Sequence, residues 1–371
     1  MATNAKVMGK VLADYVIELP VVTEIDYEAG LKENKEKFAK FGCSTAGKVV
    51  DNGDMVVGRS YDLFYGNNPA YVVRTNVDGF NKTVGLVYNS FDGRTFDEVK
   101  ENGLTQEELL TLLFFTADIM NDKGFYIEAN MRPKQPEETG IAISTGTNPG
   151  AEITLSLPAL IRYLGERCAT VDEALALARS LNVCAFSNGE VNWCGGYYMA
   201  DASGHFGVLE LVDNKLIWNE GQNCQANFYI NDEYKDKATL GTGLGRYELL
   251  SSEIGQVKTA DDMTALMKKV RYSQILDPYN CPFDPCSECC GEEVPGVGVL
   301  TLAMCDDGKY KDAILQGLEE SSALERAKSL QQLKDEGAQW VSVWQTTANC
   351  NKQTIKVVFY EEDELTFDFA V

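Results

Sequence analysis

The chain has 371 residues, of which 44% are hydrophobic, which is enough for a packed core and excludes a disordered polymer. Its formal net charge of −23 and the lack of any Lys/Arg-rich run exclude a duplex-binding surface, so nucleic acid is not an expected partner. The single histidine, His205, excludes a multi-histidine metal site and requires any Cys–His or Ser–His mechanism to use that residue.

The cysteines and the N-terminus bear on the compartment. The eleven cysteines are an odd number, which excludes complete pairing within the chain, and they are sparse compared with a disulfide-stapled domain. The first residues do not resemble a signal peptide, and no window of ~18 apolar residues predicts a membrane helix. We therefore expect a cytoplasmic protein with no membrane partner. Export by an unconventional route is the alternative.

The N-terminal elements are predicted first. Residues 24–42 are charge-rich with apolar residues near a helical spacing, which predicts a helix that stops at Gly42. The segments 43–50 and 55–63 are β-rich and flank Asn52-Gly53, a strong short-range signal for a hairpin.

The rest of the chain alternates predicted strands and helices. The strand candidates are 124–130, 195–201, 206–212, 215–220, 297–304, 340–347 and 354–361. Capping-box-like helix starts occur at Thr105-x-x-Glu108, Thr170-x-x-Glu173 and Thr259-x-x-Asp262. Because the strands come as neighbouring pairs with short turns, the pattern predicts an α+β fold with helices layered on mostly antiparallel sheets.

The hairpin places a cysteine near charged residues. A two-residue turn at Asn52-Gly53 predicts that Cys43 lies opposite Asp62, with Cβ atoms ~5 Å apart. Strict alternation then puts Arg59 on the other face, from which it reaches Cys43 only where the strand bends or bulges. Taken alone, this spacing favours an ordinary hairpin with a cysteine and a surface aspartate.

A family resemblance changes that interpretation. Cys43-Ser44-Thr45, followed by Gly58-Arg59-Ser60-Tyr61-Asp62, resembles the start of mature choloylglycine hydrolases, which include bile salt hydrolases and penicillin V acylases of the N-terminal nucleophile (Ntn) hydrolase superfamily. Similar segments follow in collinear order up to about residue 361, and they include 120–130, Gln225-Ala226-Asn227-Phe228, Gly245-Arg246-Tyr247, Val294-Pro295-Gly296 and 340–347. The resemblance implies a four-layer αββα sandwich with two mostly antiparallel sheets.

The resemblance also implies a mechanism and roles. Cys43, as the N-terminal residue, would attack an amide carbonyl and form a thioester, with its own α-amine as general base. Asp62 would orient that amine, and Arg59 would favour the thiolate. The Asn227 side chain and the Asn130 backbone N–H would form the oxyanion hole. Arg246 would support the site electrostatically, and neither a cofactor nor a metal is required.

This mechanism requires processing, because Cys43 is not the first residue of the chain. We expect the Cys43 thiol to attack the preceding carbonyl and cleave the Gly42–Cys43 bond. Residues 1–42 are then a removable prosegment, and residues 43–371 form a single catalytic domain. The alternative is a permanent N-terminal extension on an inactive relative.

The expected substrate is a small-molecule N-acyl amide, either a conjugated bile salt or a penicillin V-like compound. Tyr61, Phe64, Tyr65 and Tyr88 are candidates for an apolar acyl pocket and equally for the core. The alternatives are an acyltransferase or ceramidase-like amidase of the same superfamily, a cysteine protease that uses His205, and a non-catalytic acidic binding protein. Family resemblance implies a homo-oligomer, a tetramer.

Two features fall outside the resemblance. The insertion 281–290 carries four cysteines, Cys281, Cys286, Cys289 and Cys290, at a spacing that matches no standard zinc finger. We expect incidental or redox-active thiols there rather than a metal site. His205 lies in a predicted turn between strands, and we expect it to be exposed and not catalytic.

Overall fold

The computed structural model describes most of two large sheets and the helices that pack on them. The described residues are 3–8, 11–17, 41–65, 70–76, 79–88, 101–102, 116–132, 144–187, 192–234, 244–270, 293–294, 298–299, 339–359 and 363–368. The predicted strand 297–304 lies outside them apart from residues 298–299, and so do the helix start at Thr105 and the cysteine-rich segment 281–290.

The first sheet has ten strands. Its order is β1 (Thr3–Met8), β2 (Val11–Ile17), β5 (Ala70–Thr75), β6 (Thr83–Tyr88), β7 (Thr116–Asn121), β8 (Tyr126–Arg132), β12 (Asn192–Ala200), β13 (Phe206–Val212) and β14 (Lys215–Glu220), with β11 (Phe186–Ser187) paired to β12. Its strand pairs are antiparallel except for β2 with β5, which is parallel. The N-terminal hairpin β1–β2 therefore extends this sheet beyond β5.

The second sheet has six antiparallel strands. Its order is β15 (Cys224–Gln225), β3 (Phe41–Val49), β4 (Met55–Tyr65), β18 (Gln339–Asn349), β19 (Thr354–Phe359) and β20 (Asp363–Asp368). The remaining elements are α5 (Leu157–Arg167), α6 (Val171–Ser180), α7 (Leu244–Glu253), η3 (Ile254–Gln256), α8 (Ala260–Lys268) and the short strand pairs β9 (Thr154–Ser156) with β10 (Asn182–Cys184) and β16 (Glu293–Val294) with β17 (Gly298–Val299).

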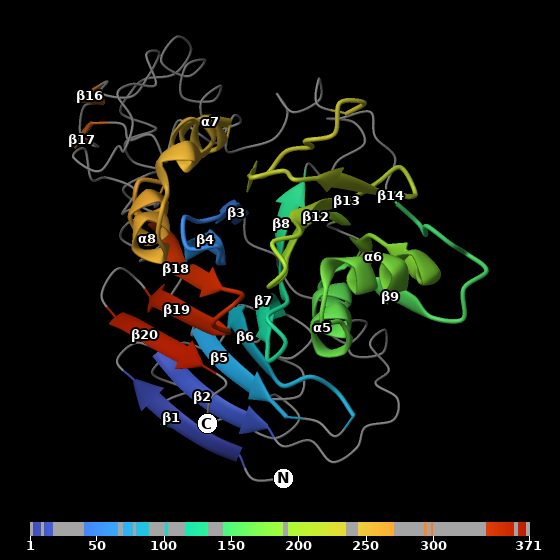
Figure 1. Ribbon diagram of the computed structural model, residues 1–371, viewed down its shortest axis with the longest axis horizontal. Helices are drawn as coiled ribbons and strands as arrows, with labels where there is room; N and C mark the ends of the chain where they lie inside the picture. Colours follow the sequence, from blue (N-terminus) through green and yellow to red (C-terminus); the bar gives the residue numbers. More distant parts are fainter. Residues whose placement is uncertain are drawn as a thin grey trace.

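The elements stack in four layers (Figure 1). α5 packs on β7 and β8 of the first sheet, while α8 packs on β4 and β18 of the second, and β3 faces β8 across the interior. Three hydrophobic clusters fill the three gaps, and Leu164, Trp344 and Met263 are representative of them. The predicted α+β class with two large, mostly antiparallel sheets is confirmed.

Local signals explain several elements. Thr170 caps α6 by accepting a hydrogen bond from the Glu173 backbone N–H, and Thr259 forms a complete capping box with Asp262 at the start of α8. Two predicted strands, 206–212 and 215–220, match β13 and β14 at both ends. The predicted helix 24–42 is wrong at its last two residues, because Phe41 and Gly42 belong to β3; its earlier residues lie outside the described part.

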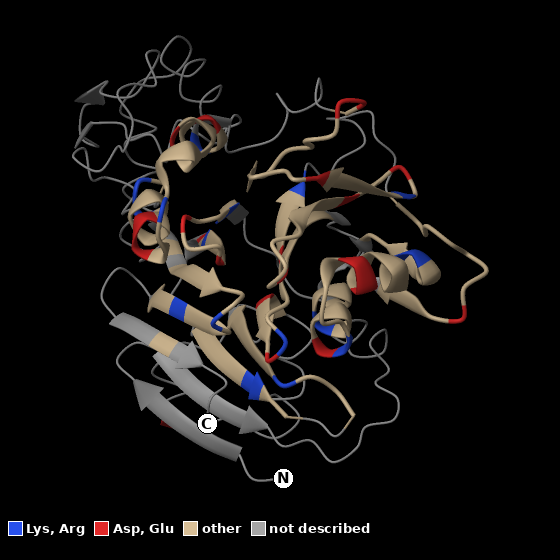
Figure 2. Cartoon of the chain, in the orientation of Figure 1, with Lys and Arg blue, Asp and Glu red and all other residues tan. Residues whose placement is uncertain are grey.

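Charged residues of both signs occur along the described elements. Figure 2 shows Lys and Arg residues interspersed with Asp and Glu along these helices, strands and turns. Among the described helices, none is long and apolar enough to cross a membrane.

The β3–β4 turn differs from the predicted one. The Gly53 N–H donates to the Val50 carbonyl and the Val50 N–H donates to the Asp54 carbonyl, so the loop has three residues, Asp51–Gly53, and not two. Gly53 has φ of +88°, the left-handed conformation that closes a three-residue hairpin loop. The prediction of a two-residue turn is therefore wrong by one residue.

Candidate active site

The longer loop changes which residues face each other on β3 and β4. Cys43 pairs with Tyr61, and Asp62 pairs with Gly42, in a register that is continuous from Phe41 to Val49. The prediction that Asp62 lies opposite Cys43 is therefore wrong. Because side chains alternate along a strand, Cys43 shares one face with Arg59, while Asp62 lies on the other.

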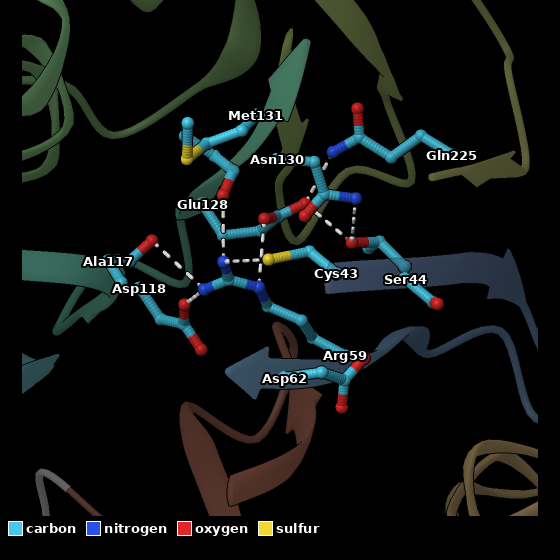
Figure 3. A network of polar contacts seen from close by, with 12 residues as sticks. Cys43, Ser44, Arg59, Asp62, Ala117, Asp118, Glu128, Asn130, Met131 and Gln225 are labelled. Atoms are coloured by element: carbon cyan, nitrogen blue, oxygen red, sulfur yellow. Dashed lines mark hydrogen bonds and ion pairs between the residues drawn. The ribbon is translucent and has the colours of Figure 1, made fainter. Parts of the chain in front are cut away.

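Arg59 contacts the thiol of Cys43 directly. Its Nη2 donates to Cys43 Sγ at 3.6 Å and to the Ala129 carbonyl at 2.7 Å, as Figure 3 shows. Arg59 is on the same face and one diagonal position from Cys43, so it needs no bend or bulge between β3 and β4 to reach it. The predicted two-residue turn allowed Arg59 to reach Cys43 only through a bend or bulge. The observed register allows this contact in regular strands.

Two buried carboxylates hold the Arg59 guanidinium in place. Nη1 forms an ion pair with Asp118 on β7, and Nε lies 3.0 Å from Glu128 Oε2 on β8. Glu128 in turn accepts hydrogen bonds from Thr45 Oγ1 at 2.6 Å and Gln225 Nε2 at 2.5 Å. All three charged side chains are fully buried, so the cation that touches Cys43 is fixed from the opposite sheet.

The backbone of Cys43 is held on the side away from β4. Its N–H donates to Asn227 Oδ1 at 2.8 Å, and its carbonyl accepts from Arg246 Nη1 at 2.9 Å. Arg246 Nη2 also lies 3.3 Å from Asn227 Oδ1, and Asn227 Nδ2 donates to the Met131 carbonyl at 3.1 Å. The structure thus brings Cys43, Arg59, Asn227 and Arg246 into one connected network.

Arg246 lies in the first turn of α7, where the helix dipole disfavours a cation by about 0.3–1 kcal/mol. The side chain is nonetheless buried, and it bonds Ser44 Oγ at 2.6 Å besides the Cys43 carbonyl. These hydrogen bonds offset the unfavourable position. The helix start therefore carries a cation aimed at β3 rather than the usual acidic residue.

Asp62 belongs to the opposite face of β4. Its Oδ1 accepts hydrogen bonds from Ser60 Oγ at 2.7 Å and Ser342 Oγ at 2.6 Å. Its Oδ2 makes no hydrogen bond to any described residue and lies 3.6 Å from Arg246 Nη1. Burial raises the pKa of this carboxyl to about 6, against the opposing effect of Arg246 and the two serines.

The raised pKa gives a pH-dependent prediction for the uncleaved chain. Folded Asp62 keeps a proton that the unfolded chain releases near pH 3.8, so its contribution to stability is lost as the pH rises through about 6. Against a Cys43→Ala chain, which stays uncleaved, adding Asp62→Asn is expected to flatten this loss. The difference between the two chains amounts to at most roughly 3 kcal/mol. Urea unfolding of both from pH 4 to 7 measures it, and parallel curves would contradict it.

The Cys43 thiol is neutral in this setting. Burial raises its pKa to about 11, and Arg59 opposes that rise without cancelling it, while Asp62 and Glu128 add to it. Arg59 thus acts in the expected direction, towards the thiolate, but burial outweighs it and the thiol stays protonated in the uncleaved chain. A proton acceptor is needed before this sulfur attacks a carbonyl.

Asn130 lies on β8, directly opposite Gly196 of β12. Its Nδ2 is 3.4 Å from Thr45 Oγ1, and its buried Oδ1 makes no hydrogen bond to any described residue. Figure 3 draws its side chain in the same network of polar contacts as those of Cys43, Ser44 and Gln225. The assignment of its backbone N–H to an oxyanion hole stays a prediction.

The structure separates the pocket candidates. Tyr61 is buried and stacks on Trp344 with ring centroids 4.0 Å apart, and Arg59 lies over its ring at 4.9 Å. Phe64 and Tyr65 belong to β4 and Tyr88 to β6, but their side chains lie outside the described part. Tyr61 thus lies on the Cys43 face and is also part of the core between the sheets.

His205 does not belong to this network. It lies in the turn between β12 and β13, where Nε2 is 2.9 Å from Glu220 Oε1 and Nδ1 is 3.4 Å from Asp172 Oδ1. Its ring also meets Trp218 edge-on. The expectation of an exposed residue is wrong, because the side chain is only 22% exposed.

The other cysteines provide no metal site in the described ranges. Cys43, Cys168, Cys224 and Cys350 are free thiols, and Cys184 Sγ donates to the Leu155 carbonyl at 3.5 Å. No group of three or more His, Cys, Asp or Glu residues suited to a metal ion occurs among the residues that the structure describes. The cluster at 281–290 lies outside them.

Comparisons with known proteins yield structural neighbours only. No protein-family model matches the chain, and no curated protein matches it. Among solved structures, the chain is similar to two variants of the conjugated bile acid hydrolase from Clostridium perfringens, each at 12% identity and a TM-score of 0.45, over 88% of this chain and 92% of theirs.

Proposed function

We propose that this chain is an amide hydrolase whose nucleophile is Cys43, freed as an N-terminal residue by cleavage of the Gly42–Cys43 bond. The observation that carries the proposal is the convergence on one buried cysteine: Arg59 on its sulfur, Asn227 on its N–H and Arg246 on its carbonyl. A structural cysteine behaves as a small apolar residue, and its sulfur needs no buried cation beside it.

The balance of buried charge supports an N-terminal ammonium at Cys43. Asp62, Asp118 and Glu128 are three buried carboxylates around two buried cations, Arg59 and Arg246. The uncleaved chain thus holds a surplus of negative charge, which is costly in a poorly solvated interior. Cleavage adds one protonated amine next to Gly42, the residue that pairs with Asp62. Asp62 Oδ2, which makes no hydrogen bond to any described residue, is the acceptor we assign to it.

The same amine supplies the missing base. Before cleavage the Cys43 nitrogen is an amide, which accepts no proton, and the thiol stays protonated because its pKa is about 11. An α-amine has an ordinary pKa of about 7.7–8.0, which suits proton transfer at neutral pH. The uncleaved chain is therefore inactive in our proposal, and cleavage activates it.

Maturation also passes through a thioester, but it takes place before the α-amine exists, so the thiol proton passes to the Cys43 nitrogen only as that nitrogen leaves the Gly42 carbonyl carbon. Cys43 Sγ attacks the Gly42 carbonyl carbon, the Gly42–Cys43 C–N bond breaks, and the thiol proton ends on the Cys43 nitrogen. Water then hydrolyses the Gly42 thioester, which restores the thiol and releases Gly42 as a carboxylate. One water molecule is consumed, and no other reactant is required.

In the catalytic cycle, the α-amine takes the thiol proton while Sγ bonds to the substrate carbonyl carbon. Asn227 Nδ2 has a second N–H besides the one that contacts Met131, and we assign that N–H to the developing oxyanion. The protonated amine passes its proton to the leaving nitrogen as the C–N bond breaks. In the second half of the cycle the α-amine takes a proton from water, whose oxygen bonds to the thioester carbonyl carbon. The C–S bond breaks, the protonated amine returns the proton to the sulfur, and the acid is released.

The substrate we propose is a linear N-acyl amide with an apolar acyl group, either a conjugated bile salt or a penicillin V-like compound. The sequence resemblance supports this class, and the buried Tyr61–Trp344 stack lies on the Cys43 face. The test is to incubate the processed protein with each compound and measure the freed amine. Glycine or taurine release identifies a bile salt hydrolase, and 6-aminopenicillanate release identifies a penicillin V acylase. Failure on both and on other N-acyl amides favours a binding protein, and product that appears only with an added amine favours an acyltransferase.

His205→Ala is expected to keep kcat close to the wild-type value. The ring contacts Glu220, Asp172 and Trp218, none of which contacts Cys43 in the described network. Steady-state hydrolysis of the preferred amide by the processed chains checks this result. A loss of two or more orders of magnitude would instead identify a Cys–His mechanism.

A further inference from the structure

The segment that carries Asn227 has little regular structure of its own. Beyond the two-residue strand β15, residues 226–231 belong to neither a helix nor a longer strand. Asn227 nevertheless makes contacts in two directions, to the Cys43 N–H on one sheet and to the Met131 carbonyl on the other. Side chains outside the segment must therefore fix its path.

Arg132, at the end of β8, holds the residues immediately before Asn227. Its Nη1 donates to the Ala226 carbonyl at 2.5 Å, and its Nη2 donates to Gln225 Oε1 at 2.7 Å. The side chain is buried, and Gln225 also bonds Glu128, which pairs with Arg59. One guanidinium thus connects the Asn227 segment to the group that holds the Arg59 cation.

Glu210, on β13, holds the residues after Asn227. It accepts the backbone N–H groups of Ile230 at 2.9 Å and Asn231 at 3.0 Å. Arg132 Nε in turn lies 3.1 Å from Glu210 Oε1, and both side chains are fully buried. The Arg132–Glu210 pair therefore forms hydrogen bonds to the segment on both sides of Asn227.

A glycine makes room for this arrangement. Gly196 is the neighbour of Glu210 in the register of β12 and β13, and a Cβ there would lie 1.9 Å from Arg132 Nη2. The Arg132 guanidinium thus packs directly against the backbone of Gly196, where a side chain would leave no room for it. Because its three bonds leave three different nitrogens of one planar group, a lysine cannot reproduce them.

We propose that Arg132 is a positioning residue that sets the placement of Asn227, and through it the rate of amide cleavage. This inference rests on the proposed function, in which Asn227 stabilises the oxyanion. Arg132 contacts neither Cys43 nor the substrate in this assignment. Its loss therefore acts on the transition state through the position of another residue.

Arg132→Lys, which keeps the charge and loses the planar group, is expected to lower kcat about 10²-fold with KM close to the wild-type value. The rate is expressed per molecule processed to residues 43–371, as counted by intact mass, so that a partly misfolded preparation does not imitate the effect. Arg162→Lys is the matched control, because Arg162 is equally buried and pairs with Glu166 within α5. It is expected to keep the wild-type kcat.

A second variant approaches the same contact from the glycine. Gly196→Ala displaces the guanidinium without removing any polar group, and it is expected to lower kcat as Arg132→Lys does. Gly150→Ala, where an added Cβ meets no atom within 4 Å, controls for a glycine substitution as such. Wild-type kcat in both Arg132→Lys and Gly196→Ala would overturn the positioning role.

A crystal structure of Arg132→Lys supplies a readout that does not need activity. The bond from the Cys43 nitrogen to Asn227 Oδ1, 2.8 Å in the uncleaved chain, is expected to be lost or lengthened in the same variant kept uncleaved by Cys43→Ala. An unchanged Asn227 would overturn the inference even if the wild type proves inactive. An inactive wild type with a displaced Asn227 would instead overturn only the proposed function.

Discussion

Cys43→Ala is expected to leave the chain at its full 371 residues and to abolish amide hydrolysis, whereas the wild type matures to residues 43–371. The substitution removes the sulfur that attacks both the Gly42 carbonyl and the substrate. Loss of a nucleophile of this kind lowers kcat by about 10⁴- to 10⁶-fold. Intact mass measures the first effect and amine release the second.

Two comparisons make this result specific. Cys350→Ala removes another fully buried free thiol and is expected to leave processing and hydrolysis intact. A chain that begins directly at Cys43 is expected to hydrolyse substrate without any processing step. A purified wild type that is active while it retains residues 1–42 would contradict the mechanism, because its Cys43 nitrogen would still be an amide.

Arg59→Met is expected to lower the free energy of unfolding by about 3–5 kcal/mol. Methionine replaces the bulk of the side chain but leaves Asp118 and Glu128 as buried carboxylates without their shared cation. Removing one partner of a buried ion pair is costly because the remaining charge stays desolvated. Urea unfolding of the uncleaved Cys43→Ala chain, with and without Arg59→Met, measures the change at constant m.

Neutralising the carboxylates separates charge from packing. Adding Asp118→Asn and Glu128→Gln to Arg59→Met is expected to recover much of the lost stability, since no unpaired charge remains. The amide oxygen of the asparagine in Asp118→Asn can still accept the hydrogen bond from Trp344 Nε1. The amide oxygen of the glutamine in Glu128→Gln can still accept those from Thr45 and Gln225. A triple variant as unstable as the single one would assign the loss to packing instead.

Local sequence signals predicted the elements well and their mutual register less well. The caps at Thr170 and Thr259 and the strands at 206–212 and 215–220 follow from short-range chemistry and alternation, which a sequence displays directly. The β3–β4 register depends on the conformation of one glycine. Asn-Gly is compatible with both a two-residue and a three-residue loop, and the wrong choice placed Asp62, rather than Arg59, on the Cys43 face.

The residues that sequence patterns did not identify are those that hold Arg59 and the Asn227 segment in place. Glu128, Asn130 and Arg132 alternate along β8 and face the second sheet, but only Asn130 was singled out from the sequence. Polar residues at every second position of an otherwise apolar strand indicate a polar face, and this pattern can be read from the sequence. Asp118 offered no comparable signal, because its partner Arg59 lies on a distant strand of the other sheet. Long-range ion pairs of this kind are not encoded by spacing.

The three-residue loop Asp51–Gly53 has a consequence for how this protein tolerates insertions and deletions. Deleting one loop residue would preserve the register only if Val50 and Asp54 closed the loop with two residues between them. A loop that kept three residues would shift β4 by one position and exchange its two faces, so that Ser60 and Asp62 would replace Arg59 and Tyr61 beside Cys43. The exposed tip of a hairpin is usually the place where length varies freely. Here the way the loop closes sets the register that puts Arg59 beside Cys43, although the loop residues Asp51–Gly53 lie at the far end of the hairpin from that contact.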